Sequence, residues 1–321
     1  MRIPINEVTP ETGRAAIRGW VHEIRDLGGL FFCLVRDRTG LIQVTVVKKK
    51  APAAVIEAIR GLNRESVVEA EGTVKAIEKA PGGRELVPDC LTVISSSASP
   101  LPLDVVEKVP AELDTRLDAR FMDLRRPRVT AVFMIRSAVI QATNEFLFAR
   151  GFTQITTPKV VAAATEGGTE LFPIAYFERE AFLNQSPQLY KQMMMAAGFE
   201  KVFEIGPIFR AEEHNTTKHL NEATSIDVEV SFADHQDVMQ LLEDLVAHVY
   251  AAVADRCSDQ IANIGCDRFC VPKRPFPRIT YRDAIEIAAR KTGEDIVFVF
   301  DVATTAEKAL GEEVGEHYFI V

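Results

Sequence analysis

The sequence lacks several features that would assign it to a broad class at once. No run of about 18 apolar residues occurs, which excludes an ordinary membrane-spanning helix, and Met1–Pro4 has no apolar segment typical of a secretory signal. The five cysteines form no CxxC pair, which argues against a structural zinc and favours reduced thiols. The phosphate-binding pattern GxxxxGK(S/T) is also absent, so a nucleotide would be bound in another way. We therefore expect a cytoplasmic protein with no membrane partner.

The length and charge that are present indicate two parts with different tasks. The chain has 321 residues, of which 47% are apolar and 26% charged, as in globular proteins of about two domains. A net charge of −9 argues against a protein whose whole surface is basic and suited to binding nucleic acid. However, residues 1–103 carry a formal charge of +2 and the remainder −11. This asymmetry separates a slightly basic first third from an acidic body.

The first third has the pattern of a small β-domain. Residues 14–47 alternate between apolar and polar positions as half-buried strands do, with turns at Asp26–Gly29 and Asp37–Gly40. A short helix begins at Pro52, and two more strands flank Pro81–Gly83. Five strands with a helix between the third and fourth is the order of an OB-fold, a barrel that binds oligonucleotides. A generic five-stranded β-domain fits the same pattern.

The remainder reads as a linker followed by a mixed domain. Ser95–Pro102 has a linker composition and leads into a polar, Arg-rich stretch. A helix with apolar residues at helical spacing follows, and Gly151 ends it. A helix followed by antiparallel strands with long intervening loops favours an α+β body over a parallel doubly wound one. We divide the chain into 1–103, a hinge over 104–128, and 129–321.

The segment Arg210–Glu222 is the strongest candidate for chemistry. It is a long charged loop between two apolar strands, and long loops of this kind usually have a function. Arg210 stands at a strand end, where a guanidinium can clamp a phosphate or carboxylate. Lys218 and His219 could serve the outer phosphates of a nucleotide. A solvated charged loop is the alternative, and the histidines have no zinc-ligand spacing with a cysteine, so no metal site is expected.

Two further polar segments could hold a small acidic amino acid. The loop Thr165–Pro173 has two glycines between acidic residues, and its carboxylates could bind an ammonium group. Gln188 and Lys191 are three residues apart, which places both on one helical face. A lysine amine with a glutamine amide suits a carboxylate-bearing side chain. A flexible surface turn and a surface helix start are the respective alternatives.

In this order, the segments resemble one family from about residue 13 onward: the class II aspartyl-tRNA synthetases of the archaeal/eukaryotic type. Arg120–Pro127 resembles the entry to the family's catalytic domain, and Arg210–Glu222 resembles its motif 2 loop. The helix before Gly151 and the strand ending at Pro158 are similar to motif 1, which implies a homodimer. The implied fold is α+β: an OB-fold barrel, then part of a synthetase domain whose antiparallel sheet is flanked by helices.

The resemblance implies that aspartate and ATP form aspartyl-adenylate and that the aspartyl group then passes to tRNA. Arg210 is the implied catalytic residue, because it would bridge the substrate carboxylate and the α-phosphate. Where many class II enzymes stack an aromatic residue on adenine, this chain has Ala223–Thr224. The implied aspartate-binding residues are Glu166, Gln188, Leu189, Tyr190, Lys191, Arg210 and Asp227. The implied ATP-binding residues are Arg210, Ala211, Glu212, Lys218, His219 and Leu220.

The resemblance also implies a tRNA-reading barrel. Phe32 would stack on an anticodon base, and Gln43 and Glu85 would hydrogen-bond anticodon bases. Core packing is the alternative for Phe32. His22 and Pro81 stand where strict enzymes of this type tend to have Trp and Lys and relaxed ones His and Pro. We therefore expect both tRNA(Asp) and tRNA(Asn) as partners.

The chain ends on Glu316–Val321, an apolar, β-prone run without a polar tail. We expect a chain cut within a strand, with an edge strand as the alternative. Motif 3 and the carboxylates for Mg²⁺ would then lie beyond it, and the chain alone would not form adenylate at an enzymatic rate. Other interpretations are an asparaginyl-tRNA synthetase, which Lys191 disfavours, an asparagine-making paralogue, which the OB domain disfavours, and a non-catalytic tRNA-binding module.

Overall fold

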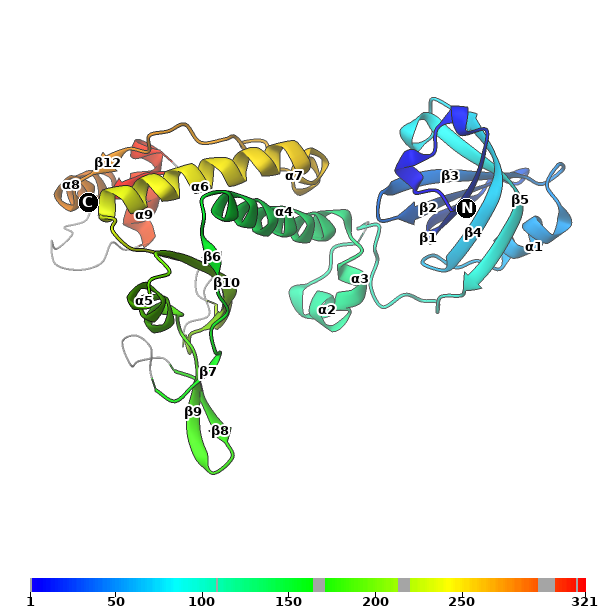
Figure 1. The fold of residues 1–321 in the computed structure, drawn as a ribbon. Helices are drawn as coiled ribbons and strands as arrows, with labels where there is room; N and C mark the ends of the chain where they lie inside the picture. Colours follow the sequence, from blue (N-terminus) through cyan, green and yellow to red (C-terminus); the bar gives the residue numbers. More distant parts are fainter. Residues whose placement is uncertain (1, 108, 164–170, 213–219, 294–303, 316) are drawn as a thin grey trace. The chain divides into compact units, whose positions relative to one another are not determined.

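The computed structural model describes the whole chain except residues 1, 108, 164–170, 213–219, 294–303 and 316 (Figure 1). The described residues form two compact units, Met1–Val129 and Thr130–Val321. Each unit is described separately below.

The first unit contains a closed β-barrel with the strand order β1-β2-β3-β5-β4. Helix α1 joins β3 to β4, which is the OB-fold order expected from the sequence. Pro52 is the N-cap of α1 and not its first helical residue. The bounds are β1 (Arg14–Asp26), β2 (Leu30–Asp37), β3 (Gly40–Val47), α1 (Ala53–Arg60), β4 (Val67–Ala76) and β5 (Arg84–Ser95), with short 3₁₀ helices η1 (Ile5–Glu7), η2 (Pro10–Thr12) and η3 (Pro81–Gly83).

The barrel core follows directly from the period-two pattern of its strands. On β2, Phe31, Cys33 and Val35 are buried inside the barrel. Phe31 and Val35 each contribute roughly 1.5–3 kcal/mol when fully removed from water. The alternate residues Phe32 and Leu34 are only partly buried and lie on the outer face. The interpretation of Phe32 as a core residue is therefore wrong.

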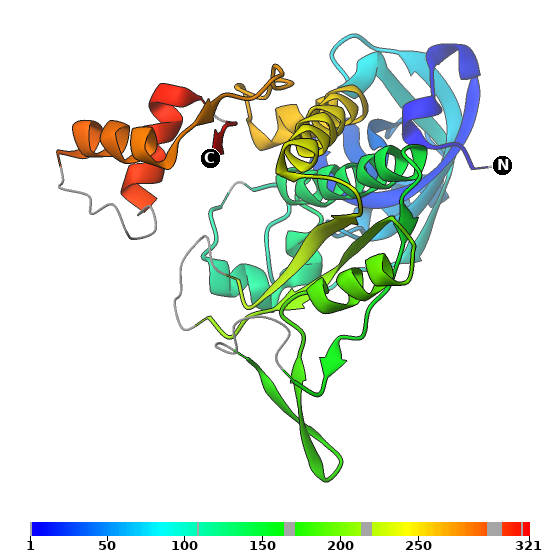
Figure 2. The ribbon, with the colours of Figure 1, turned by 60° about the vertical axis from the view of Figure 1, so that its left-hand side comes forward.

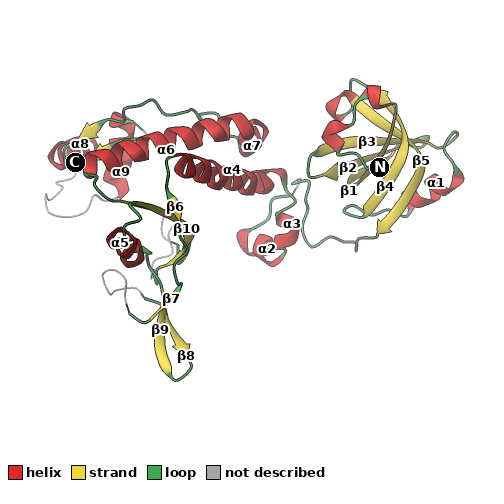
Figure 3. Cartoon of the chain, viewed as in Figure 1, coloured by secondary structure: helices red, strands yellow, loops and turns green. Residues whose placement is uncertain are grey.

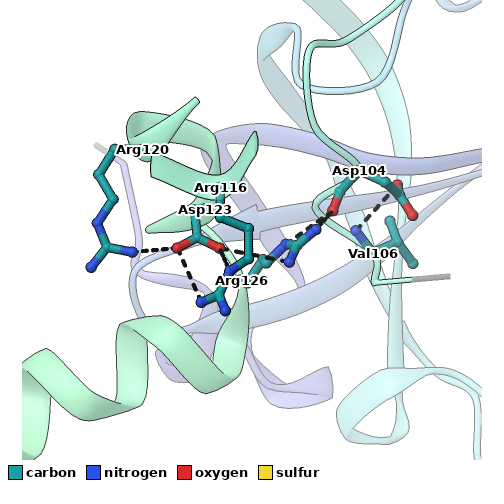
Figure 4. Close-up of polar contacts among 6 residues, drawn as sticks. All are labelled: Asp104, Val106, Arg116, Arg120, Asp123 and Arg126. Carbon is teal, nitrogen blue, oxygen red and sulfur yellow. Dashed lines mark hydrogen bonds and ion pairs between the residues drawn. The ribbon is translucent and has the colours of Figure 1, made fainter. Parts of the chain in front are cut away.

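The Arg-rich stretch after the barrel is ordered around one buried carboxylate. It contains two short helices, α2 (Leu113–Asp118) and α3 (Arg120–Asp123), which its polar composition does not predict. Asp123 has no exposed surface and accepts hydrogen bonds from Arg116 Nε at 2.8 Å and from Arg120, with Arg126 Nη1 at 3.6 Å (Figure 4). Arg126 in turn donates to the Asp104 carbonyl oxygen at 2.9 Å. The hydrogen bond from Arg116 is the main cause of a lowered Asp123 pKa.

The second unit is built on a long antiparallel strand pair. Among the described residues, β10 lies between β11 and β6, antiparallel to the former and parallel to the latter. Phe146 and Leu147 of α4 and Leu245 of α6 pack against Phe203 of β10 and so cover one face of the pair. Helix α5 lies beside β10 in both ribbon views (Figure 1 and Figure 2). The bounds are α4 (Pro127–Ala149), β6 (Thr153–Gln154), α5 (Gln188–Ala196), β10 (Lys201–Phe209), β11 (Glu222–Val230) and α6 (His235–Arg256).

The remaining elements flank this pair, and the unit combines helices with mainly antiparallel strands, as expected of an α+β fold (Figure 3). A small sheet has the order β7-β9-β8, and β13 pairs in parallel with β12, so Phe319–Ile320 lies in a strand. Among the described helices, none has the length and apolar character needed to cross a membrane. The bounds are β7 (Val160–Val161), β8 (Pro173–Tyr176), β9 (Arg179–Leu183), α7 (Ser258–Ile264), β12 (Arg278–Ile279), α8 (Tyr281–Thr292), α9 (Thr304–Val314) and β13 (Phe319–Ile320).

Candidate active site and nucleic-acid surface

A buried lysine joins α5 to β11. Lys191 is 4% exposed, and its Nζ donates to Asp227 Oδ1 at 3.1 Å and to the Val228 carbonyl oxygen at 3.3 Å. Glu229 Oε2 lies 3.6 Å from the same Nζ and 3.4 Å from Gln188 Nε2. The structure thus brings Gln188, Lys191 and Asp227 together as the helical spacing and the resemblance indicate. Glu229 was missed, although its position two residues after Asp227 places it on the same strand face.

A second lysine–carboxylate pair occupies the same face of the sheet. Glu204 of β10 stands directly opposite Asp227 of β11 and is buried. It accepts hydrogen bonds from the Thr157 amide at 2.9 Å, from Thr157 Oγ1 at 2.7 Å and from Lys159 Nζ at 2.9 Å. These bonds tie β10 to the segment that follows β6. A glutamate between two apolar residues of a buried strand was the available signal, because a buried charge needs partners.

Arg210 extends the same strand pair by one residue. Its backbone N–H donates to the Asn221 carbonyl oxygen at 3.0 Å, directly after the last paired residues, Phe209 and Glu222. The side chain is exposed. Arg210 therefore stands at the end of the two strands whose middle carries Asp227.

The other expected substrate-binding residues are placed less uniformly. Ala211 and Glu212 follow Arg210 and are partly buried, whereas Leu220 is 64% exposed. On α5, Leu189 is 49% exposed and Tyr190 is partly buried. Glu166, Lys218 and His219 lie outside the described residues.

Ala223 and Thr224, where the resemblance led us to expect an aromatic residue, point to opposite faces of β11. Thr224 Oγ1 accepts a hydrogen bond from Arg136 Nη2 of α4 at 2.7 Å. Ala223 is paired with Ile208 and therefore lies on the face that carries Asp227. The face next to Arg210 thus offers small and branched apolar side chains.

On the barrel, three expected tRNA-binding residues form one outer patch. Gln43 of β3 is paired with Glu85 of β5, and its Nε2 donates to Glu85 Oε2 at 3.2 Å. Thr45 Oγ1 donates to the same oxygen at 2.6 Å, and Thr45 is the cross-strand partner of Phe32. An aromatic ring beside fixed amide and carboxylate groups can stack on a base and read its edge.

His22 and Pro81, the two expected discrimination residues, lie in separate elements. His22 is 9% exposed in β1 and its Nδ1 is 2.8 Å from Arg36 Nη1. Burial first, and then the Arg36 guanidinium, lower the pKa of His22. Pro81 starts η3, four residues before Glu85, and is partly buried.

Comparison with known proteins identifies both units. Residues 15–94 match the OB-fold nucleic acid binding domains, and residues 112–320 match the family "tRNA synthetases class II (D, K and N)". A nucleic-acid-binding barrel followed by such a domain defines a class II aminoacyl-tRNA synthetase, an ATP-using enzyme. The chain belongs to the class II (D, K and N) tRNA synthetase family, which confirms the expected family and fold.

The most similar relatives include archaeal ligases. The "Aspartate--tRNA(Asp/Asn) ligase" of Methanospirillum hungatei is 67% identical over all of this chain and 75% of its own length. The protein of the same name from Archaeoglobus fulgidus is 58% identical over all of this chain and 74% of its own length. Among solved structures, asparaginyl-tRNA synthetase from Pyrococcus horikoshii with asparaginyl-adenylate has a TM-score of 0.89 at 32% identity, over 98% of this chain and 72% of that chain.

Proposed function

We propose that the chain belongs to an aspartate--tRNA(Asp/Asn) ligase, which activates L-aspartate with ATP and transfers it to tRNA(Asp) and tRNA(Asn). The observation that carries this proposal is the 67% identity, over the entire chain, to a ligase of that name. The enzyme is proposed to act in the cytoplasm.

The Lys191 ammonium supports aspartate as the amino acid. A lysine only donates hydrogen bonds and carries a charge, so it pairs better with the β-carboxylate of aspartate than with the amide of asparagine. Asp227 and Glu229 hold the ammonium in place before the substrate arrives, and Gln188 bonds Glu229 beside it. This arrangement argues against asparagine as the substrate, despite the fold shared with asparaginyl-tRNA synthetases. Glu166, Leu189 and Tyr190 are proposed to complete the pocket.

Arg210 is the proposed catalytic residue of adenylate formation. An oxygen of the aspartate α-carboxylate attacks the α-phosphorus of ATP, and the bond from that phosphorus to the pyrophosphate oxygen breaks. A guanidinium that contacts both carboxylate and phosphate positions the reactants and stabilises the charge that develops between them. Because Arg210 directly follows strand β10, the strand pair holds its backbone in place.

The rest of the ATP site is proposed around the motif 2 loop. Ala223 and Ile208 offer apolar contacts for adenine, and Ala211, Glu212 and Leu220 follow or precede the loop. Lys218 and His219 are proposed for the outer phosphates. Mg²⁺ is proposed to accompany ATP, but among the described residues no group of three His, Cys, Asp or Glu could hold a metal ion. No step is therefore assigned to it.

The barrel is proposed to bind the anticodon loop. Stacking on Phe32 would contribute about 1–3 kcal/mol, while Gln43 and Glu85 would bond base edges, and His22 with Pro81 would permit both tRNAs. A homodimer is proposed through α4, whose Val132, Phe133 and Met134 are exposed. Light scattering on the purified protein would test the dimer.

Charging assays test the central proposal. The protein that carries these 321 residues is incubated with ATP, labelled aspartate and transcripts of tRNA(Asp) or tRNA(Asn), with asparagine as the competing amino acid. Both transcripts are expected to accept aspartate. A kcat/KM preference for tRNA(Asp) above about 10³-fold, or charging with asparagine, would contradict it.

A further inference from the structure

His22 occupies an irregular position in the barrel. The pairing of β1 with β2 passes from Val21 opposite Val35 to Glu23 opposite Leu34, so His22 is the extra residue of a β-bulge. Bulges re-aim side chains and are common next to functional sites. The neighbouring outward position of β2 is Arg36, and its Nη1 lies 2.8 Å from His22 Nδ1. The bulge therefore turns the imidazole onto a guanidinium.

This contact determines which imidazole nitrogen carries the proton. A guanidinium has only donors and stays protonated, so Nδ1 must be the acceptor. The single proton of the neutral ring is then on Nε2, which becomes a hydrogen-bond donor. Burial and Arg36 lower the pKa of His22 against the opposing carboxylates of Glu65 and Glu23, with Arg64 acting in the same direction as Arg36. The second proton is therefore disfavoured at neutral pH.

Arg36 is itself held by a buried carboxylate. Glu65 Oε2 accepts from Arg36 Nη2 at 2.9 Å and from Arg125 Nη1 at 2.7 Å. Glu65 has a left-handed backbone with φ of 66°, and its N–H donates to the Val21 carbonyl oxygen at 2.6 Å, next to the bulge. A non-glycine residue adopts this conformation only where surrounding contacts enforce it. Both terminal nitrogens of the Arg36 guanidinium are thus engaged, Nη1 by His22 and Nη2 by Glu65.

We propose that Arg36 is a specificity-determining residue that presents His22 to the anticodon as a fixed Nε2–H donor, so that the facing base is recognised through an acceptor common to cytosine and uracil. The inference rests on the proposed role of His22 in tRNA binding. The anticodons of tRNA(Asp) and tRNA(Asn) differ in one base, cytosine in the first and uracil in the second. At N3 and at position 4 these bases exchange donor and acceptor, whereas both carry the acceptor O2. A group that can only donate therefore bonds O2 of cytosine and of uracil equally well.

Base analogues test the chemistry directly. Anticodon stem-loops are made with cytosine, uracil, pyrimidin-2-one or 2-thiouracil at the variable position, and their binding to the full chain is measured. Pyrimidin-2-one keeps O2 and lacks the group at position 4, so it is expected to bind within about 2-fold of cytosine and uracil. The 2-thio analogue is expected to bind about 3- to 10-fold more weakly, as the loss of one hydrogen bond predicts. A loss above about 5-fold for pyrimidin-2-one would overturn the proposal.

Protein variants test the role of Arg36. Arg36→Gln, whose amide can accept from Nδ1–H, is expected to weaken binding of the cytosine and uracil stem-loops about 3- to 10-fold alike. Arg36→Lys keeps a donor-only cation and is expected to stay within about 2-fold. Arg18→Gln is the matched control, because it removes an exposed ion pair between Arg18, on the same strand as His22, and Glu69 of β4. Unchanged binding by Arg36→Gln would overturn the proposal.

A spectroscopic measurement tests the protonation of His22 independently of tRNA binding. ¹⁵N shifts of labelled histidine, with the His22 signals identified by their loss in His22→Gln, are expected to show a protonated Nε2 and an unprotonated Nδ1 at neutral pH in the free protein. Arg36→Gln is expected to change this pattern. A protonated Nδ1 in the unmodified protein would overturn the inference. If His22→Ala leaves the binding of every stem-loop unchanged, the proposed role of His22 in tRNA binding is wrong, whatever the ¹⁵N shifts show.

Discussion

Lys191 and Asp227 meet at 3.1 Å across the interface between helix α5 and strand β11. The helix contributes a nearly inaccessible ammonium, and the strand contributes a partly exposed carboxylate. Because the pair lies 36 residues apart in the chain, only the packing of α5 on β11 brings it together. It gives the proposed aspartate pocket a positive group that is already oriented.

Replacing Lys191 tests that pocket. Lys191→Met removes the cation for the β-carboxylate and leaves Asp227 and Glu229 without a positive partner, so aspartate binding should fall about 30-fold or more. Calorimetric titration with aspartate and asparagine measures the effect. Lys308→Met, on the exposed surface of α9, should bind as the unmodified protein does. Equal loss of affinity for asparagine would show that Lys191 does not read the carboxylate.

Arg210→Lys tests the proposed transition-state contact. A lysine keeps the charge but lacks the planar guanidinium with its two parallel donors. In the protein that carries these 321 residues, aspartate-dependent pyrophosphate exchange should therefore slow about 10²- to 10³-fold in kcat. The aspartate KM should change far less. A variant with full kcat and a raised KM would instead assign Arg210 to substrate binding alone.

Asp123→Asn should destabilise the first unit by about 3 kcal/mol, because three arginines lose the charge that holds them. Urea unfolding monitored by the single tryptophan, Trp20, reports on this unit. Asp89→Asn, which affects an exposed pair with Arg14, should cost less than about 1 kcal/mol. Since the folded-state pKa of Asp123 is lowered, its contribution is complete above the ordinary pKa and disappears as the pH falls through the lowered value. Equal effects of the two variants at pH 7 would contradict the role of Asp123.

His22 gives a pH dependence of the same sign in a higher pH range. Its pKa is lowered in the folded state, so the unfolded chain binds the proton more readily. Its effect on stability is absent above about pH 6.5 and becomes destabilising as the pH falls below that value. His22→Gln should therefore flatten the loss of stability between about pH 6.5 and 5. Denaturant midpoints at matched pH values measure this, and parallel profiles would refute it.

The thiols should differ sharply in reactivity. Burial raises the pKa of Cys33 to about 12, and it also raises that of Cys257. Cys90, Cys266 and Cys270 are exposed. A disulfide reagent at pH 8 should modify these three in the native protein and reach the buried pair only after unfolding. Rapid native modification of Cys33 would show that the barrel opens.

The sequence alone was sufficient where the signal is local and periodic. Alternation in residues 14–47 predicts the barrel strands, because inward and outward side chains of a strand must differ when one face is buried. The apolar spacing after Val129 predicts most of α4, which begins two residues earlier at Pro127. The family, and with it most candidate site residues, followed from the order of polar motifs.

Short polar elements were not predictable in this way. Helices α2 and α3 have no apolar period, and they are held by the arginines around Asp123. Glu204 and Glu229 were overlooked for a related reason: one carboxylate in a strand does not reveal whether a lysine from another segment will reach it.

Composition and periodicity by themselves predicted a five-stranded β-domain, an α+β body and a charged segment after residue 209. Only the tertiary structure decided that Lys191 is placed between two carboxylates and that Arg36 fixes the imidazole of His22. Local patterns record whether a side chain is buried, whereas the partner of a buried charge is set by long-range strand register and helix packing.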